Sequence, residues 1–151
     1  ENALNFGIKN LERCFKDINN KNVEKITHIC CGYPDKLDAI NYPKAPLNSY
    51  SKISKELDKS IIDTVSIEDA HRYNNLEFLR DFKNTKVIFG LIKIASSQIE
   101  TKEEIVSRIK EVIKFIDKKQ LIVAPDCGLG HLPRDLAKNK LKIMVEAAKS
   151  F

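Results

Sequence analysis

The stretch Lys86–Ala95, "KVIFGLIKIA", is apolar almost throughout, whereas a strand with one wet face alternates apolar and polar residues. An apolar run of this kind, rich in β-branched residues, predicts a strand that is buried on both faces. Three other runs share this character and are also predicted as strands: Lys25–Cys31, Ile61–Glu68 and Gln120–Asp126. Strands of this type favour a parallel sheet packed against helices.

Amphipathic segments precede, separate and follow these strands. Residues 2–18 place apolar side chains at helical spacing, and the "NNKN" that follows closes the segment. Further helical segments are predicted at about Asn48–Leu57, Asn75–Phe82, Lys102–Ile116 and Leu136–Ala148. Thr101 and Glu104 have the spacing of a capping box, and Pro133 precedes the last helix. The order is one helix followed by four strand–helix units, which is typical of an α/β fold.

Length and composition predict one soluble domain over residues 1–151, or part of one. With 151 residues and 42% hydrophobic content, the chain is long enough for one substantial core and too short for two ordinary ones. No apolar run approaches the roughly 18 to 20 residues of a membrane span, and the first residues lack a signal pattern. The net charge of +5 comes from scattered lysines without interleaved aromatics, which argues against nucleic-acid binding.

Side chains suited to metal binding gather where the predicted strands end. His28 and Cys30 end the first strand, Glu68 ends the second, and Cys127 directly follows the fourth. Parallel α/β folds build their active sites at the C-terminal ends of strands, in barrels and in open sheets alike. The 4 cysteines, two of them adjacent, form a poor disulfide framework and are better suited to metal binding in a reducing cytoplasm.

Alternation along the first strand puts His28 and Cys30 on the same side, about 6 to 7 Å apart. Zinc usually takes four ligands, and Glu68 and Cys127 are chemically suitable partners at the ends of two other strands. Each residue alone also has an ordinary interpretation: a hydrogen-bonded core histidine, a buried cysteine, or a glutamate paired with Arg72 or Lys93. Only the joint placement indicates a metal site. Redox chemistry at adjacent Cys30 and Cys31 is disfavoured, because neighbours on a strand face opposite ways.

Three segments carry a resemblance to a known family: "THICCGYP" at 27–34, "VSIEDAHR" at 65–72 and "VAPDCGLG" at 123–130. They resemble the zinc-site segments of the cobalamin-independent methionine synthases, in the C-terminal catalytic barrel, and the likeness continues to the closing "KLKIMVEAAK". In that family a histidine, two cysteines and a glutamate hold zinc, and these match His28, Cys30, Cys127 and Glu68. The resemblance implies the C-terminal half of a (β/α)8 TIM barrel. It also implies a zinc-dependent methyltransferase that activates a thiol, most simply homocysteine, as a zinc-bound thiolate.

One segment departs from the family pattern. Full methionine synthases have a histidine that assists proton transfer to the departing folate, but this chain has "KIASS" at 93–97, with Ala95 at that position. His71 is the other candidate proton source. The methyl donor is therefore expected to be either a folate or a more activated group such as a methyl-corrinoid. Beside the metal ligands, the residues predicted to contact substrate are Glu68, Ser66, Ser96 and Asp126.

The resemblance also predicts what lies outside these residues. The family's substrate-binding aspartate is expected upstream of Glu1, and a complete barrel has eight strands and typically about 250 residues. We therefore expect the partner to be the N-terminal half of the barrel or a second copy of the chain, and this part alone to be inactive. Two alternatives stay open: a zinc-binding relic without catalysis, and a coenzyme M-type thiol alkyltransferase.

Overall fold

The computed structural model describes residues 2–151, and within them a parallel sheet has the strand order β1-β2-β3-β4. The strands are β1 (Ile26–Ile29), β2 (Thr64–Ile67), β3 (Lys86–Ile92) and β4 (Leu121–Pro125). All four predicted strands are confirmed, and each is shorter than its apolar run. The third ends at Ile92 rather than Ala95, because its register with β4 shifts between Gly90 and Ile92 and the chain then turns away.

Helical segments alternate with the strands as predicted. They are η1 (Ala3–Gly7), α1 (Ile8–Phe15), α2 (Ser49–Lys59), η2 (Leu76–Asp81), α3 (Lys102–Val112), η3 (Lys118–Gln120) and α4 (Arg134–Ala148). The capping box of Thr101 and Glu104 is confirmed at the start of α3. The segment predicted at 75–82 forms the 3-10 helix η2, whose first N–H groups are capped by Asn75. The first helix is divided into a π-helical turn, η1, and α1.

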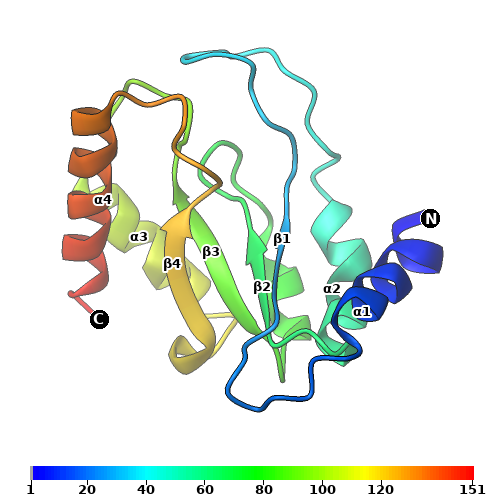
Figure 1. The fold of residues 1–151 in the computed structure, drawn as a ribbon. Coiled ribbons are helices and arrows are strands. Elements are labelled where there is room, and N and C mark those ends of the chain that lie inside the picture. Colours follow the sequence, from blue (N-terminus) through cyan, green and yellow to red (C-terminus); the bar gives the residue numbers. More distant parts are fainter. Residues whose placement is uncertain (1) are drawn as a thin grey trace.

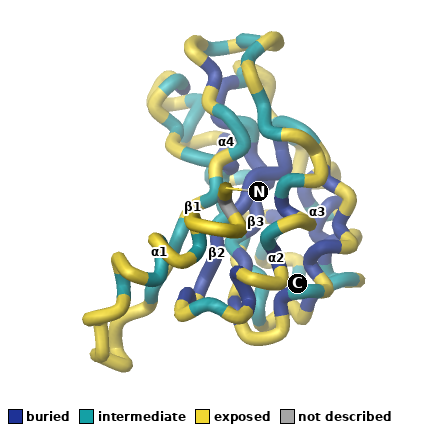
Figure 2. The backbone as a smooth tube through the Cα atoms, turned by 90° about the vertical axis from the view of Figure 1, so that its right-hand side faces the viewer, coloured by how far each residue is buried: buried dark blue, intermediate teal, exposed yellow. Residues whose placement is uncertain are grey.

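The helices cover one face of the sheet, and Figure 1 shows α3 behind the strands and α2 to the right of β1. The side chains that point toward these helices include Val65, Val87 and Phe89, each 0% exposed. The other face is open: Ile26 is 46% exposed and Ile122 is 41% exposed. The prediction that the strands are buried on both faces is therefore wrong for the edge strands β1 and β4, whereas Thr64 on the central strand β2 is 0% exposed. Figure 2 shows the same division between the buried interior and exposed outer segments.

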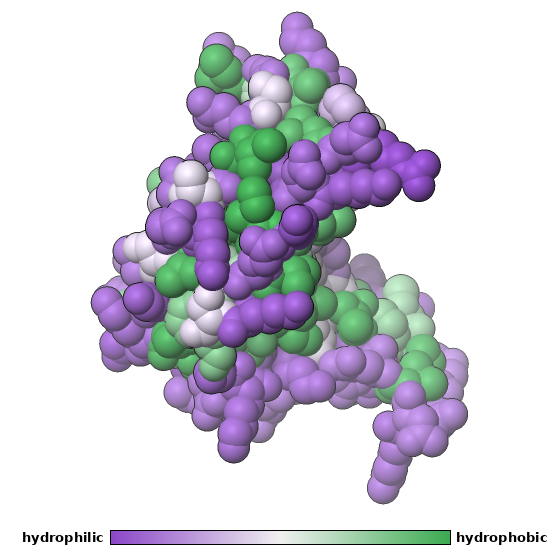
Figure 3. All heavy atoms as spheres, turned by 90° about the vertical axis from the view of Figure 1, so that its left-hand side faces the viewer, coloured by the Kyte–Doolittle hydropathy of each residue, from purple (hydrophilic) through white to green (hydrophobic). Residues whose placement is uncertain are grey.

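The two edges of the sheet are β1 and β4, which have no further strand beside them among the described residues. Figure 3 views the side of the molecule where α4 and the β4 edge lie, and apolar side chains are visible there among charged ones. The C-terminal ends of the four strands meet at one edge of the sheet, where the long segment 32–47 and the turns after β3 and β4 also gather (Figure 1). No helix in the described part of the chain has the length and apolarity that a membrane crossing requires.

Candidate metal centre

Three of the four predicted ligands come together at the C-terminal edge of the sheet. The ligand atoms of His28, Glu68 and Cys127 all lie within 4.8 Å of one another. His28 belongs to β1, Glu68 directly follows β2, and Cys127 follows β4 by one intervening residue. Their proximity results from the parallel register, which brings the same end of each strand to one place.

The imidazole of His28 is oriented by a hydroxyl on the next strand. Nδ1 of His28 lies 2.9 Å from Oγ of Ser66, the residue opposite it in the β1–β2 register. If Nδ1 carries the proton and donates it to Ser66, Nε2 keeps a lone pair, and Nε2 lies 3.5 Å from Oε1 of Glu68. Ser66, predicted to contact substrate, therefore supports the histidine ring.

Glu68 is 8% exposed and its two carboxylate oxygens differ. Oε2 accepts the N–H of Cys31 at 2.9 Å, whereas Oε1 is buried and has no hydrogen-bond partner among the described residues. Burial raises the pKa of Glu68, but the nearby His28 and Cys30 side chains and the Cys31 N–H outweigh it and hold the pKa below its usual value. A buried, unpartnered carboxylate oxygen is costly, and a bound cation would satisfy it. Together with an imidazole and thiols, this donor set fits zinc.

The backbone at Glu68 is fixed by a tyrosine that the sequence analysis did not identify. The N–H of Glu68 donates to Oη of Tyr50 at 2.8 Å, and Oη donates to the carbonyl oxygen of Ile29 at 2.8 Å. Tyr50 is 2% exposed and lies on α2. One phenol thus joins the ends of β1 and β2. In the sequence, it is indistinguishable from any apolar-face residue of an amphipathic helix.

Cys30 lies beside this cluster and outside the group of three. Its Sγ accepts the N–H of Gly32 at 3.4 Å, and the residue is exposed at the open face. Packing around the thiol raises the pKa of Cys30 to about 11, the Gly32 N–H opposes the rise, and nearby Glu68 and Cys127 add to it. The thiol is therefore protonated at neutral pH, and metal binding would release its proton.

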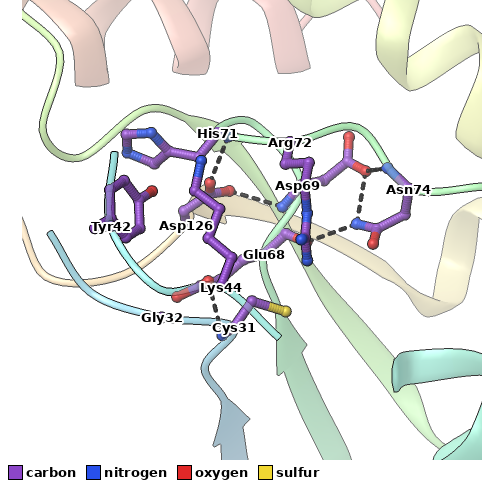
Figure 4. A pocket seen from close by; sticks show the side chains of 10 residues that line it. All are labelled: Cys31, Gly32, Tyr42, Lys44, Glu68, Asp69, His71, Arg72, Asn74 and Asp126. Atoms are coloured by element: carbon purple, nitrogen blue, oxygen red, sulfur yellow. Dashed lines mark hydrogen bonds between the residues drawn. The ribbon is translucent and has the colours of Figure 1, made fainter. Parts of the chain in front are cut away.

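A pocket adjoins Glu68, and Figure 4 shows the side chains that line it. In it, Nε2 of His71 accepts two backbone N–H groups, from Ile94 at 2.9 Å and from Ala95 at 3.3 Å. Burial and the charges of Lys44 and Lys93 lower the pKa of His71 to about 4. The ring is therefore neutral at pH 7, with Nε2 occupied. Any proton that it donates must leave from Nδ1.

The remaining predicted substrate contacts have partners within the protein. Both carboxylate oxygens of Asp126 accept backbone N–H groups from the loop after β2. Oγ of Ser96 accepts the N–H of Gln98 at 3.3 Å. Sequence reasoning also missed Tyr33, whose Oη donates to the carbonyl oxygen of Gly128 at 3.1 Å. This bond ties segment 32–47 to the turn that carries Cys127, and the length of that segment was the available signal.

Comparison with known proteins gives consistent results. The family described as "Cobalamin-independent synthase, Catalytic domain" matches residues 19–150. Methionine synthase of Pyrococcus horikoshii is 32% identical over 103 residues, which are 68% of this chain and 30% of that protein. Methionine synthase of Sulfurisphaera tokodaii is 28% identical over 99% of this chain and 38% of its own length.

A solved structure extends the similarity to the fold. The B12-independent methionine synthase from Shewanella sp. W3-18-1, solved in complex with selenomethionine, has a TM-score of 0.83 and 28% identity. The match covers 99% of this chain and 43% of that one, so the chain spans less than half the length of the relatives described here. The predicted fold class, a helix followed by four parallel strand–helix units of a barrel, is confirmed.

Proposed function

Because this chain belongs to the catalytic-domain family of the cobalamin-independent synthases, we propose that it supplies the zinc site of a methionine-synthase-like methyltransferase. The reaction would transfer a methyl group to a thiol, most simply homocysteine. The acceptor thiol loses its proton and gains an S–CH3 bond, while the bond between the methyl group and the donor breaks, its electron pair stays with the donor, and the proton passes to solvent or to a basic donor atom. The selenomethionine found with the Shewanella protein is an analogue of methionine, the product of methyl transfer to homocysteine, and so supports a reaction of this type.

The observation that carries the proposal is the unpartnered, buried Oε1 of Glu68 facing Nε2 of His28 at 3.5 Å, with Cys127 in the same cluster. A carboxylate oxygen that is buried without a hydrogen-bond partner is costly, and a cation held between it, the imidazole and the thiol would offset that cost. Cys30, next to Glu68, would complete four ligands.

The residues of this chain then have distinct roles. Bound zinc would supply Lewis acidity, which lowers the pKa of a substrate thiol and so favours the nucleophilic thiolate. His28 is held by Ser66 with Nε2 available, and the two cysteines provide soft donors. Glu68 is the hardest donor of the set, and we propose that it yields its place to the substrate sulfur.

The methyl donor is proposed to be more activated than a methylfolate. A folate nitrogen leaves poorly unless it is protonated, and general acid catalysis of this kind typically contributes about 10² to 10⁴-fold. Ala95 cannot supply a proton, and His71, with a pKa of about 4, is almost entirely unprotonated at neutral pH. A methyl-corrinoid, whose leaving group needs no proton, fits this site better.

The open face of the sheet is proposed to pack against the upstream half of the same barrel. Ile26 and Ile122 are 46% and 41% exposed on that face, and the strands at both sheet edges, β1 and β4, lack neighbours among residues 2–151. Unpaired parallel edges and exposed apolar side chains favour association. The relatives, of which this chain matches 30% to 43%, are long enough to contain such a half.

Metal content tests the proposal. Cys30→Ser and Cys127→Ser should each abolish tight zinc binding, since a hydroxyl of high pKa replaces a thiolate. Cys14→Ser and Cys31→Ser are the matched controls and should retain zinc. Zinc-edge X-ray absorption with and without homocysteine should show an oxygen ligand replaced by sulfur. Retention of stoichiometric zinc by both Cys30→Ser and Cys127→Ser after dialysis against a chelator would exclude this site.

A further inference from the structure

We propose that Asp126 is a positioning residue that fixes the Glu68 and Cys127 ligands relative to each other. Its carboxylate fits because Gly90 has no side chain to occupy the same space. The inference rests on the proposed function, because it assigns a role toward the metal of that site. Glu68 and Cys127 come from β2 and β4, which are not neighbours in the sheet, because β3 lies between them. Ladder hydrogen bonds therefore do not join these two strand ends directly.

The carboxylate of Asp126 supplies that connection. It is 1% exposed, and its Oδ1 accepts the N–H groups of Asp69 and Ala70, each at 2.9 Å. Oδ2 accepts the N–H of His71 at 2.8 Å. These three donors directly follow Glu68 in the chain, whereas Cys127 directly follows Asp126. Figure 4 shows the carboxylate beneath this loop, with Glu68 alongside. One buried side chain thus fixes both ligand-bearing turns.

Gly90 on β3 provides the space through which the carboxylate reaches β2. A Cβ atom at position 90 would lie 2.0 Å from Oδ1 of Asp126 and 2.9 Å from its Cα. Neither distance is compatible with non-bonded atoms, so any other residue at position 90 would displace the carboxylate. Glycine within a strand weakens it and often marks a close approach by another group. Here that group is Asp126.

The same molecule contains a chemically matched carboxylate without a ligand beside it. Oδ1 of Asp58 accepts the N–H groups of Lys83, Asn84 and Thr85, each at 2.9 Å. Asp58 lies on α2 and is 9% exposed, and the loop 83–85 that it binds leads into the N-terminal end of β3, away from the metal centre. If Asp126 served only to satisfy backbone N–H groups, removing either carboxylate would have the same consequences.

The test compares Asp126→Asn, Gly90→Ala and Asp58→Asn with the unmodified protein in its native assembly. Urea unfolding gives stability, and titration with Co²⁺ gives metal affinity and the thiolate charge-transfer band. Both aspartate variants should lower the unfolding midpoint. Only Asp126→Asn and Gly90→Ala should also weaken Co²⁺ binding, by about 10 to 100-fold, and alter the band. Gly90→Ala displaces the Asp126 carboxylate without removing it. Its Co²⁺ affinity therefore tests the positioning role if Asp126→Asn does not fold.

The outcomes separate this inference from the proposed function. If the unmodified protein binds no Co²⁺, the metal site itself is wrong. If it binds Co²⁺ and folded Asp126→Asn or Gly90→Ala binds equally well, the positioning role is refuted. An equal loss of affinity in Asp58→Asn would also refute it, since a distant carboxylate would then have the same effect.

Discussion

Replacing Arg108 with methionine should lower the unfolding free energy by about 3 to 5 kcal/mol, the usual effect of removing one partner of a buried ion pair. Arg108 on α3 is 9% exposed and holds the Asp69 carboxylate by two bonds, Nε to Oδ2 at 2.8 Å and Nη2 to Oδ1 at 2.9 Å. The Asp69 side chain is 0% exposed. Two bonds from Asn74 to Oδ1 remain, but the counter-charge is lost.

The size of this effect can be checked against an exposed pair in the same protein. Nζ of Lys86 lies 3.1 Å from Oε1 of Glu24, and the two side chains are 50% and 41% exposed. Water and salt screen such a pair, so Lys86→Met should cost less than about 1 kcal/mol. Adding Asp69→Asn to Arg108→Met should restore part of the lost stability, because it removes the uncompensated buried charge.

Urea unfolding followed by circular dichroism measures these differences, since the chain has 0 tryptophans. The variants should be compared in the native assembly, so that exposed sheet edges do not dominate the signal. The reasoning fails if Arg108→Met costs no more than Lys86→Met. It also fails if the additional Asp69→Asn recovers nothing, because the loss would then come from packing rather than from an unpaired charge.

Other predictions concern pH, donor and assembly. The pKa of His71 is about 4 in the fold against 6.5 when unperturbed. Protonation of His71 should therefore leave the free energy of unfolding unchanged above pH 6.5 and lower it by about 1 to 2 kcal/mol as the pH drops to 4. His71→Gln should flatten the plot of unfolding free energy against pH in this range. Parallel plots for the variant and the unmodified protein would contradict this. With Ala95 in place of a proton donor, transfer from methylcobalamin should exceed transfer from methyltetrahydrofolate by about 10²-fold or more, and efficient folate-dependent methionine formation would refute this. The isolated chain should associate in sedimentation, and Ile122→Lys should reduce the association more than Val145→Lys, since these residues are 41% and 46% exposed on different surfaces. A monodisperse monomer with thiol-transfer activity would contradict the assembly prediction.

The strands could be predicted because each is a compact apolar run, but their ends could not. Ile94 and Ala95 continue the apolar pattern of β3, yet they donate backbone N–H groups to His71 instead of joining the ladder. After the register shift at Gly90–Ile92, a side chain from another loop thus binds the backbone that follows the strand, and the apolar pattern of the sequence does not reveal this contact. The open face was missed for a different reason. Apolar residues on it resemble those of any buried strand, whatever covers them.

The candidate ligands could be proposed from the sequence because alternation and strand ends are properties of short segments, whereas the contacts that support them join segments far apart in the chain. The sequence predicts that Asp126 contacts substrate, although in the fold three backbone N–H groups occupy its oxygens. Taken separately, Gly90 is an unfavourable residue in a strand and Asp126 is an unfavourable buried charge. Considered together, each explains the other, since the glycine leaves the space that the carboxylate fills. A glycine within one apolar strand and an aspartate at the end of the next therefore predict, as a pair, that the carboxylate packs against the glycine. That pair marks the place where two non-adjacent strand ends, and the ligands on them, are held together.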